Sequence, residues 1–105
     1  MKNRRTFTRM IHGETPVLAY FYTNKDSSCR TMHTILKLVT HHLERKLKIS
    51  LIDIDVSTNQ KIIKHYLQLP TPTFMLFHNG QIKWKDSGTF TSRSLITIIE
   101  EKLNL

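Results

Sequence analysis

The sequence predicts an α/β domain in which a mixed four-stranded sheet carries helices on both faces. The continuous apolar run at 17–22 has the length of a strand and suits a strand that is covered on both sides, and residues 73–78 indicate a further strand. Amphipathic segments separate the predicted strands, and two strands joined through a helix are expected to be parallel with a right-handed crossover. Asn79-Gly80 is a strong hairpin signal, which adds an antiparallel edge to the sheet.

Length and composition fit one domain. The chain has 105 residues and a hydrophobic fraction of 39%, which argues against disorder. We expect a single domain over 1–105, with a flexible basic N-terminus at 1–5. No apolar run approaches the roughly 20 residues needed to cross a bilayer. The basic N-terminus is followed by no apolar signal segment, so we expect a cytoplasmic protein with no membrane partner.

The first half of the chain contains two predicted helices around a strand. Apolar residues at spacings of three and four predict a short helix over 4–12. The strand at 17–22 is followed by an amphipathic helix of about five turns, whose apolar face is formed by Met32, Ile35, Leu36, Val39, Leu43 and Leu47. Asp26 precedes this helix, and its carboxylate is expected to accept a hydrogen bond from the backbone N–H of Ser28 or Cys29.

The second half contains three further strands and two helices. Residues 48–56 are rich in β-branched side chains and predict a second buried strand. A capping box at Ser57–Gln60 predicts a short helix, which Pro70 and Pro72 would end. Residues 73–78 form the third strand and 81–85 an edge strand. Thr91 or Ser92 is expected to cap the last helix.

The charge of the chain is strongly basic, with a formal net charge of +8. Such a chain tends to meet nucleic acid, anionic membranes or acidic proteins. The Lys and Arg residues are scattered, however, and do not alternate with aromatic residues as they do in RNA-binding sheets. A solvated basic surface therefore explains the charge, and a basic adaptor for nucleic acid or acidic partners remains a third possible function.

The order of elements and several motifs resemble the thioredoxin family over most of the chain, from about Phe7 to Leu103. The residues that carry this resemblance are Phe21-Tyr22, Asp26-x-x-Cys29, Leu69-Pro70-Thr71-Pro72-Thr73, Phe77-x-Asn79-Gly80 and Gly88. The resemblance implies a thioredoxin fold. The first strand of the family has no clear counterpart here, so the sheet is expected to lack it.

The resemblance also implies a thiol–disulfide site, and there this sequence departs from the family. The family uses Cys-x-x-Cys at the helix start, where the first thiol attacks and the second resolves the mixed disulfide. Here the motif is Asp26-Ser27-Ser28-Cys29, with Asp26 at the attacking position and Cys29 at the resolving one. Three neighbouring family residues are also replaced: the tryptophan by Lys25, the buried acid by Tyr20 and the helix proline by Thr34.

A surface for partner binding is implied even without the thiols. Pro72 matches the cis-proline of the family, and the backbone of the residue before it, Thr71 here, pairs with an extended substrate segment. This contact is β-augmentation and needs no cysteine. The groove between Asp26-Ser27-Ser28, Thr71-Pro72 and Gly88, with Lys25 beside it, is therefore the expected binding surface.

Two main functions follow. The first is binding of a partner protein or peptide in this groove, without redox chemistry and without a cofactor. The second is a monothiol oxidoreductase in cell redox homeostasis, in which Cys29 works with an external thiol such as glutathione. A single cysteine excludes an internal disulfide and a two-thiol cycle within the chain.

Other candidate residues carry weaker signals. The six histidines do not have the spacing of a metal site, so no metal is expected. Asp53 and Asp55 share one face of a strand and are expected to be solvated near its end. No feature of the sequence places His33 within reach of the hydroxyls of Ser27 and Ser28, so hydrolase chemistry has little support.

Overall fold

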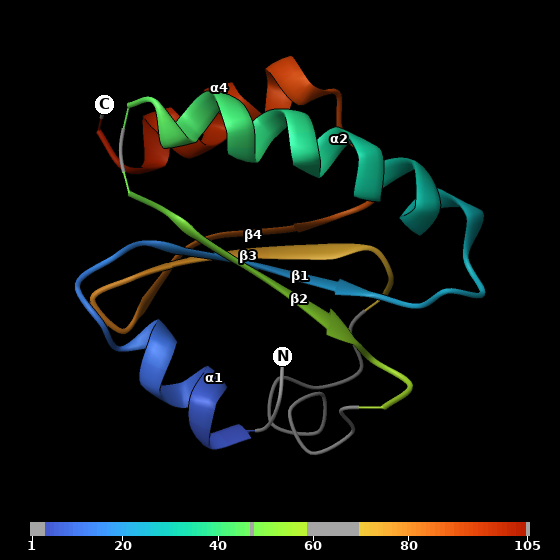
Figure 1. Cartoon of the computed structure of the whole chain (residues 1–105), viewed down its shortest axis with the longest axis horizontal. Coiled ribbons are helices and arrows are strands. Elements are labelled where there is room, and N and C mark those ends of the chain that lie inside the picture. The colour runs from blue at the N-terminus through green and yellow to red at the C-terminus, as the bar shows by residue number, and fades with distance from the viewer. Residues whose placement is uncertain (1–3, 47, 59–69, 105) are drawn as a thin grey trace.

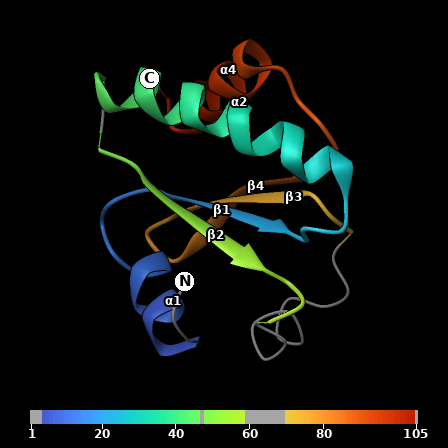
Figure 2. The ribbon, with the colours of Figure 1, turned by 45° about the vertical axis from the view of Figure 1, so that its right-hand side comes forward.

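The structure is a computed structural model that describes residues 4–46, 48–58 and 70–104. Helices α2 and α4 lie side by side on one face of the sheet and α1 lies on the other (Figures 1 and 2). This arrangement confirms the predicted α/β fold with a mixed four-stranded sheet. The described elements are α1 (Arg4–Ile11), β1 (Val17–Tyr22), α2 (Ser27–Glu44), β2 (Ser50–Asp55), β3 (Thr73–His78), β4 (Gln81–Ser87) and α4 (Ser92–Lys102).

The strand order is β2-β1-β3-β4. Strand β1 pairs parallel with β2 and antiparallel with β3, and β3 pairs antiparallel with β4. The expectation that strands joined through a helix are parallel therefore holds for β1 and β2 but is wrong for β2 and β3. Since β2 is parallel to β1 and β3 is antiparallel to it, β2 ends and β3 begins at the same end of the sheet.

Two hydrophobic cores cover the two faces of the central strands. Strands β1 and β3 contribute to both cores, because their alternate side chains point to opposite faces. On the α1 side the buried residues are Ile11, Val17, Ala19, Phe21, Ile52, Ile54, Met75 and Phe77. On the side of α2 and α4 they are Leu18, Tyr20, Met32, Leu36, Val39, Leu43, Phe74, Leu76, Leu95 and Ile99. The continuous apolar runs at 17–22 and 73–78 reflect this two-sided burial.

Strand β2 differs from the prediction of a buried strand. It stands at the edge of the described sheet, and its side chains alternate between buried and exposed. Ile52 and Ile54 are buried against the α1 side, whereas Leu51 and Asp53 are exposed on the other face. Its β-branched residues Ile52 and Ile54 therefore pack on one face only.

Other predictions about the ends of elements have mixed outcomes. Arg4 and Arg5, which the prediction placed in a flexible N-terminus, lie in the first turn of α1. The helix expected to begin near Ser57 falls on residues 59–69, which lie outside the described residues. The sequence predicted Thr91 or Ser92 as the cap of the last helix, and Thr91 is the N-cap of α4. Among the described residues, no helix is long and apolar enough to cross a membrane.

The Asn79-Gly80 turn joins β3 to β4 and also contacts the end of α1. Both turn residues have positive φ, 54° for Asn79 and 77° for Gly80. The N–H of Gly80 donates to the Ile11 carbonyl at 3.0 Å. A Cβ at position 80 would lie 2.9 Å from Cδ2 of His12, closer than Cβ contacts in proteins come. The positive φ therefore favours glycine at this position, and a Cβ would also force the His12 side chain, directly after α1, to move.

Substitution Gly80→Ala is expected to destabilise the protein by about 1–3 kcal/mol, because it adds left-handed strain and a clash with His12. The double variant His12→Ala/Gly80→Ala removes the clash and leaves the strain. In chemical denaturation, the cost of Gly80→Ala should therefore be smaller in the His12→Ala background. Equal costs in both backgrounds would show that the contact with α1 does not constrain the turn.

Candidate functional site

Asp26 organises the start of α2, directly after β1. Its backbone is extended (φ −105°, ψ 120°), and its Oδ1 accepts a hydrogen bond from the N–H of Ser28 at 2.9 Å. Its carbonyl accepts from the N–H of Cys29 at 3.1 Å. This geometry confirms the predicted N-cap. The positive potential of a helix N-terminus favours the thiolate form of a cysteine placed there. The Asp26 carboxylate neutralises this potential.

The second carboxylate oxygen of Asp26 faces the segment before β3. The Thr71 hydroxyl donates to Asp26 Oδ2 at 3.4 Å, a long hydrogen bond between residues 45 positions apart. Both side chains are half-buried. The attacking position of the motif and the residue before Pro72 therefore lie next to each other, as the resemblance implied.

Pro72 connects this pair to Gly88. The Thr71–Pro72 peptide bond is cis, and the Pro72 carbonyl accepts a hydrogen bond from the N–H of Gly88 at 2.9 Å. Ser27 is exposed at the start of α2. Lys25 is also exposed, and its N–H donates to the Thr23 hydroxyl at 3.4 Å rather than to a group of the groove. The structure thus brings Asp26, Thr71, Pro72 and Gly88 together, whereas the hydrogen bond of Lys25 goes to Thr23 outside this group.

Cys29 is a free thiol with no exposed surface. The Tyr20 hydroxyl, itself buried, donates to the Cys29 carbonyl at 2.8 Å. Burial raises the pKa of Tyr20 well above its ordinary value, and the neighbouring Cys29 raises it further. Tyr20 therefore stays protonated at neutral pH and cannot accept the proton of the thiol. Cys29 therefore lacks the access that a reactive thiol needs, and no hydrogen bond in the described part of the chain joins its thiol to a base.

One feature that the sequence reasoning missed is an aromatic cluster behind the motif. The ring of His33 packs edge-on against Tyr20 and Tyr22, with centroid distances of 5.4 and 4.8 Å. Tyr20 also stacks on Phe74 at 5.2 Å. The available signal was the alternation of tyrosines at 20 and 22, which places both rings on one face of β1. Burial raises the pKa of Tyr22, and Asp53 and Asp55 add to this shift.

The weaker candidates have local roles. Asp55 Oδ1 accepts from the N–H and the hydroxyl of Ser57 at 2.9 and 2.6 Å, which closes a turn after β2. Trp84 packs edge-on against Phe90 at 5.6 Å, so its role on the edge strand is packing. Within the described ranges, no three His, Cys, Asp or Glu residues gather as a metal site would require.

Comparison with known proteins agrees with the geometry. The thioredoxin family model matches residues 1–101. The chain belongs to the thioredoxin family. It is 32% identical over 94 residues to a thioredoxin of Rickettsia bellii, covering 90% of this chain and 88% of that protein. It is 31% identical over 96 residues to chloroplastic thioredoxin Y1 of Arabidopsis thaliana, covering 91% of this chain. The match spans 55% of thioredoxin Y1, about half its length.

Solved structures show the same fold. A mutant thioredoxin from Halobacterium salinarum superposes with a TM-score of 0.83 at 22% identity, covering 100% of this chain and 89% of that one. A structure of thioredoxin-2 described as part of the malaria parasite protein secretion machinery gives a TM-score of 0.77 at 20% identity, covering 83% and 82%. This member of the thioredoxin family has one cysteine and therefore cannot run the two-thiol cycle alone.

Substitution Asp26→Ala is expected to destabilise this thioredoxin-like chain by about 1 kcal/mol, within a range of roughly 0.5–2, because the Ser28 N–H loses its acceptor. Asp26→Asn is the matched control, since its amide oxygen still caps the helix and only the charge is lost. Urea denaturation of the three proteins measures the difference. If Ala and Asn cost the same, the cap does not stabilise the helix start.

Proposed function

We propose that this protein binds an extended segment of a partner protein in the groove formed by Asp26-Ser27-Ser28, Thr71-Pro72 and Gly88. In this function the groove works without thiol chemistry, and the partner is recognised mainly through its backbone. The observation that carries the proposal is a contrast in exposure. The Thr71 hydroxyl donates to the Asp26 carboxylate where both side chains are partly exposed, whereas Cys29 has no exposed area.

The backbone of Thr71 supports this proposal. Among the described residues, neither its N–H nor its carbonyl forms a backbone hydrogen bond, whereas the adjacent Pro72 carbonyl is bound by Gly88. With respect to the described residues, Thr71 thus keeps a backbone donor and a backbone acceptor unpaired, as the pairing with an added strand requires. The groove therefore offers main-chain pairing at Thr71, and the carboxylate of Asp26 beside it would favour partner segments with a basic or hydrogen-bond-donating side chain.

The monothiol alternative remains a second candidate from the sequence, but the burial of Cys29 weighs against it. A thiol must reach its disulfide partner, and Cys29 would need a local opening of the start of α2 first. The basic-adaptor hypothesis rests on the net charge of +8 and stays a prediction, as does a cytoplasmic location. Binding to nucleic acid that weakens steeply with salt would support the adaptor.

A blocking substitution tests the groove. An array of ten-residue peptides is probed with the protein, and affinities for the bound peptides are then measured by fluorescence anisotropy. Ser27→Trp places a large ring at the exposed start of α2 and is expected to weaken peptide binding by at least about tenfold through steric exclusion. His42→Trp is the matched control, because it adds the same ring at an exposed position near the other end of α2.

Equal binding by Ser27→Trp and wild type would place the peptides elsewhere, and an array without any bound peptide would also reject the proposal. An insulin-reduction assay with glutathione is run beside it. Turnover that disappears in Cys29→Ser would replace the binding function by the monothiol one.

A further inference from the structure

Strand β2 has one open edge. It pairs with β1 on one side, and no described strand lies on its other side. The N–H of Ser50 donates to the Pro16 carbonyl at 2.9 Å, so the backbone groups of Ser50 face β1. Because alternate residues of a strand direct these groups to opposite edges, those of Leu51 and Asp53 face away from β1. The open edge therefore offers donors and acceptors that no described strand uses.

The two edge strands of the described sheet differ in how they are protected. Strand β4 carries Lys83 and Lys85, and its ladder with β3 contains a register shift. Lysine side chains and bulges are features that keep an edge strand from pairing with another chain. Strand β2 contains neither lysine nor proline, and its register with β1 runs over all six residues without a shift. Pairing is thus hindered at β4 and open at β2.

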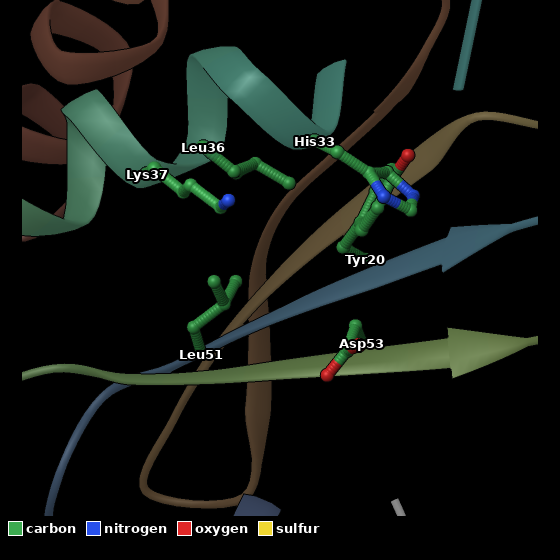
Figure 3. Close-up of a pocket in the computed structure, with 6 residues that line it drawn as sticks. All are labelled: Tyr20, His33, Leu36, Lys37, Leu51 and Asp53. Carbon is green, nitrogen blue, oxygen red and sulfur yellow. The ribbon is translucent and has the colours of Figure 1, made fainter. Parts of the chain in front are cut away.

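An exposed apolar side chain lies at the open edge. Leu51 has 36% of its surface exposed and stands on the side of β2 that faces α2 (Figure 3). It belongs to a pocket of about 200 Å³, which is lined by Tyr20, His33, Leu36, Lys37, Leu51 and Asp53. A strand added at this edge would place a side chain directly beside Leu51. An apolar side chain there is favoured, because it removes the exposed part of the leucine from water.

Opposite charges stand on the two sides of Leu51 along the chain. Asp53 lies on its C-terminal side and Lys48 on its N-terminal side, and both are exposed. Lys48 shares a concave site with Glu44, but neither Lys48 nor Asp53 forms an ion pair with another described residue. A fitting antiparallel strand has an apolar centre with an acidic residue toward Lys48 and a basic one toward Asp53. A second copy of β2, which runs in the opposite direction, has this order itself.

The pairing of two antiparallel β2 strands can be centred at different residues. A centre at Asp53 would oppose two carboxylates, and a centre at Ile52 would place each Leu51 beside a charged Asp53. A centre at Leu51 pairs the two leucines with each other. It also brings each Asp53 opposite Ile49 and next to Lys48 of the other copy. This register matches the backbone groups, the leucines and the charges at the same time.

We propose that two copies of this chain associate through β2, in antiparallel pairing about a two-fold axis at Leu51. The two sheets then form one continuous sheet, and the same patch serves on both copies. Because the two β2 strands run in opposite directions, the grooves at Thr71–Pro72 open at opposite ends of the joined sheet. The association depends neither on the function proposed for the groove nor on Cys29.

The test is the mass of the full chain in sedimentation equilibrium. The formal net charge of +8 opposes association, so the salt concentration is at least roughly 0.15 M, at which the screening length is about 8 Å. We expect a monomer–dimer equilibrium with a Kd of about 10–100 µM, as for a small interface. Leu51→Lys places two like charges at the axis and should weaken the dimer at least about tenfold.

The matched control is Ile82→Lys, which should keep the wild-type Kd. Ile82 is an exposed apolar residue of the other edge strand, β4, with 50% of its surface exposed, and the substitution adds the same charge. A charge exchange tests the register. Asp53→Lys should weaken the dimer, and Lys48→Asp/Asp53→Lys should restore it, because the opposite charges then meet again with their places exchanged.

A wild-type chain that stays monomeric up to roughly 0.5 mM overturns the proposal and leaves the edge to a strand of another protein. A dimer that Leu51→Lys does not weaken lies on another surface and also overturns it. A charge exchange that fails to restore the dimer contradicts the antiparallel register. The wild-type mass and the charge exchange decide the question even where Leu51→Lys does not fold.

Discussion

The burial of β1 on both faces is the constraint on which the rest of the structure depends. Its side chains fill both cores, and it pairs with β2 on one side and β3 on the other. Because β1 is packed on both faces and paired on both edges, its position in the sheet is fixed. Its C-terminal end therefore determines where α2 begins after Asp26. The antiparallel pairing with β3 then brings Thr71 and Pro72 to the same end of the sheet. The contact between Asp26 and Thr71 is thus a consequence of how the central strand is held.

At this end of the sheet the thioredoxin fold brings the start of α2, with Asp26 and Cys29, close to the segment with Thr71 and Pro72. The Asp26 carboxylate caps α2, and the resemblance to the family implies that it stands at the position of the attacking thiol. The remaining thiol is sealed beneath the helix start, with Tyr20 bound to its carbonyl. In front of it the Thr71 hydroxyl donates to Asp26, and the Thr71–Pro72 bond is cis. The binding of an extended segment that we propose would use the contact between Asp26 and Thr71.

Local chemistry made much of the fold predictable from the sequence. The caps at Asp26 and Thr91 and the turn at Asn79-Gly80 depend on residues close in the chain, and each is present as predicted. The direction of β3 depends on how the chain reaches it from β2. The exposure of β2 depends on its place at the edge of the described sheet. The pocket at His33 could not be predicted, because it requires α2, β1 and β2 to be placed together. The spacing of residues in the sequence does not indicate that placement.

The reactivity of the native thiol tests the central claim most directly. Cys29 is labelled with a disulfide reagent, and its rate is compared with that of the variant Ser27→Cys/Cys29→Ser, which moves the thiol to an exposed position on the same turn of α2. Because a buried thiol reacts only after local opening, we predict that Cys29 reacts at least about a hundredfold more slowly. Equal rates would contradict the account and restore Cys29 as a candidate redox residue.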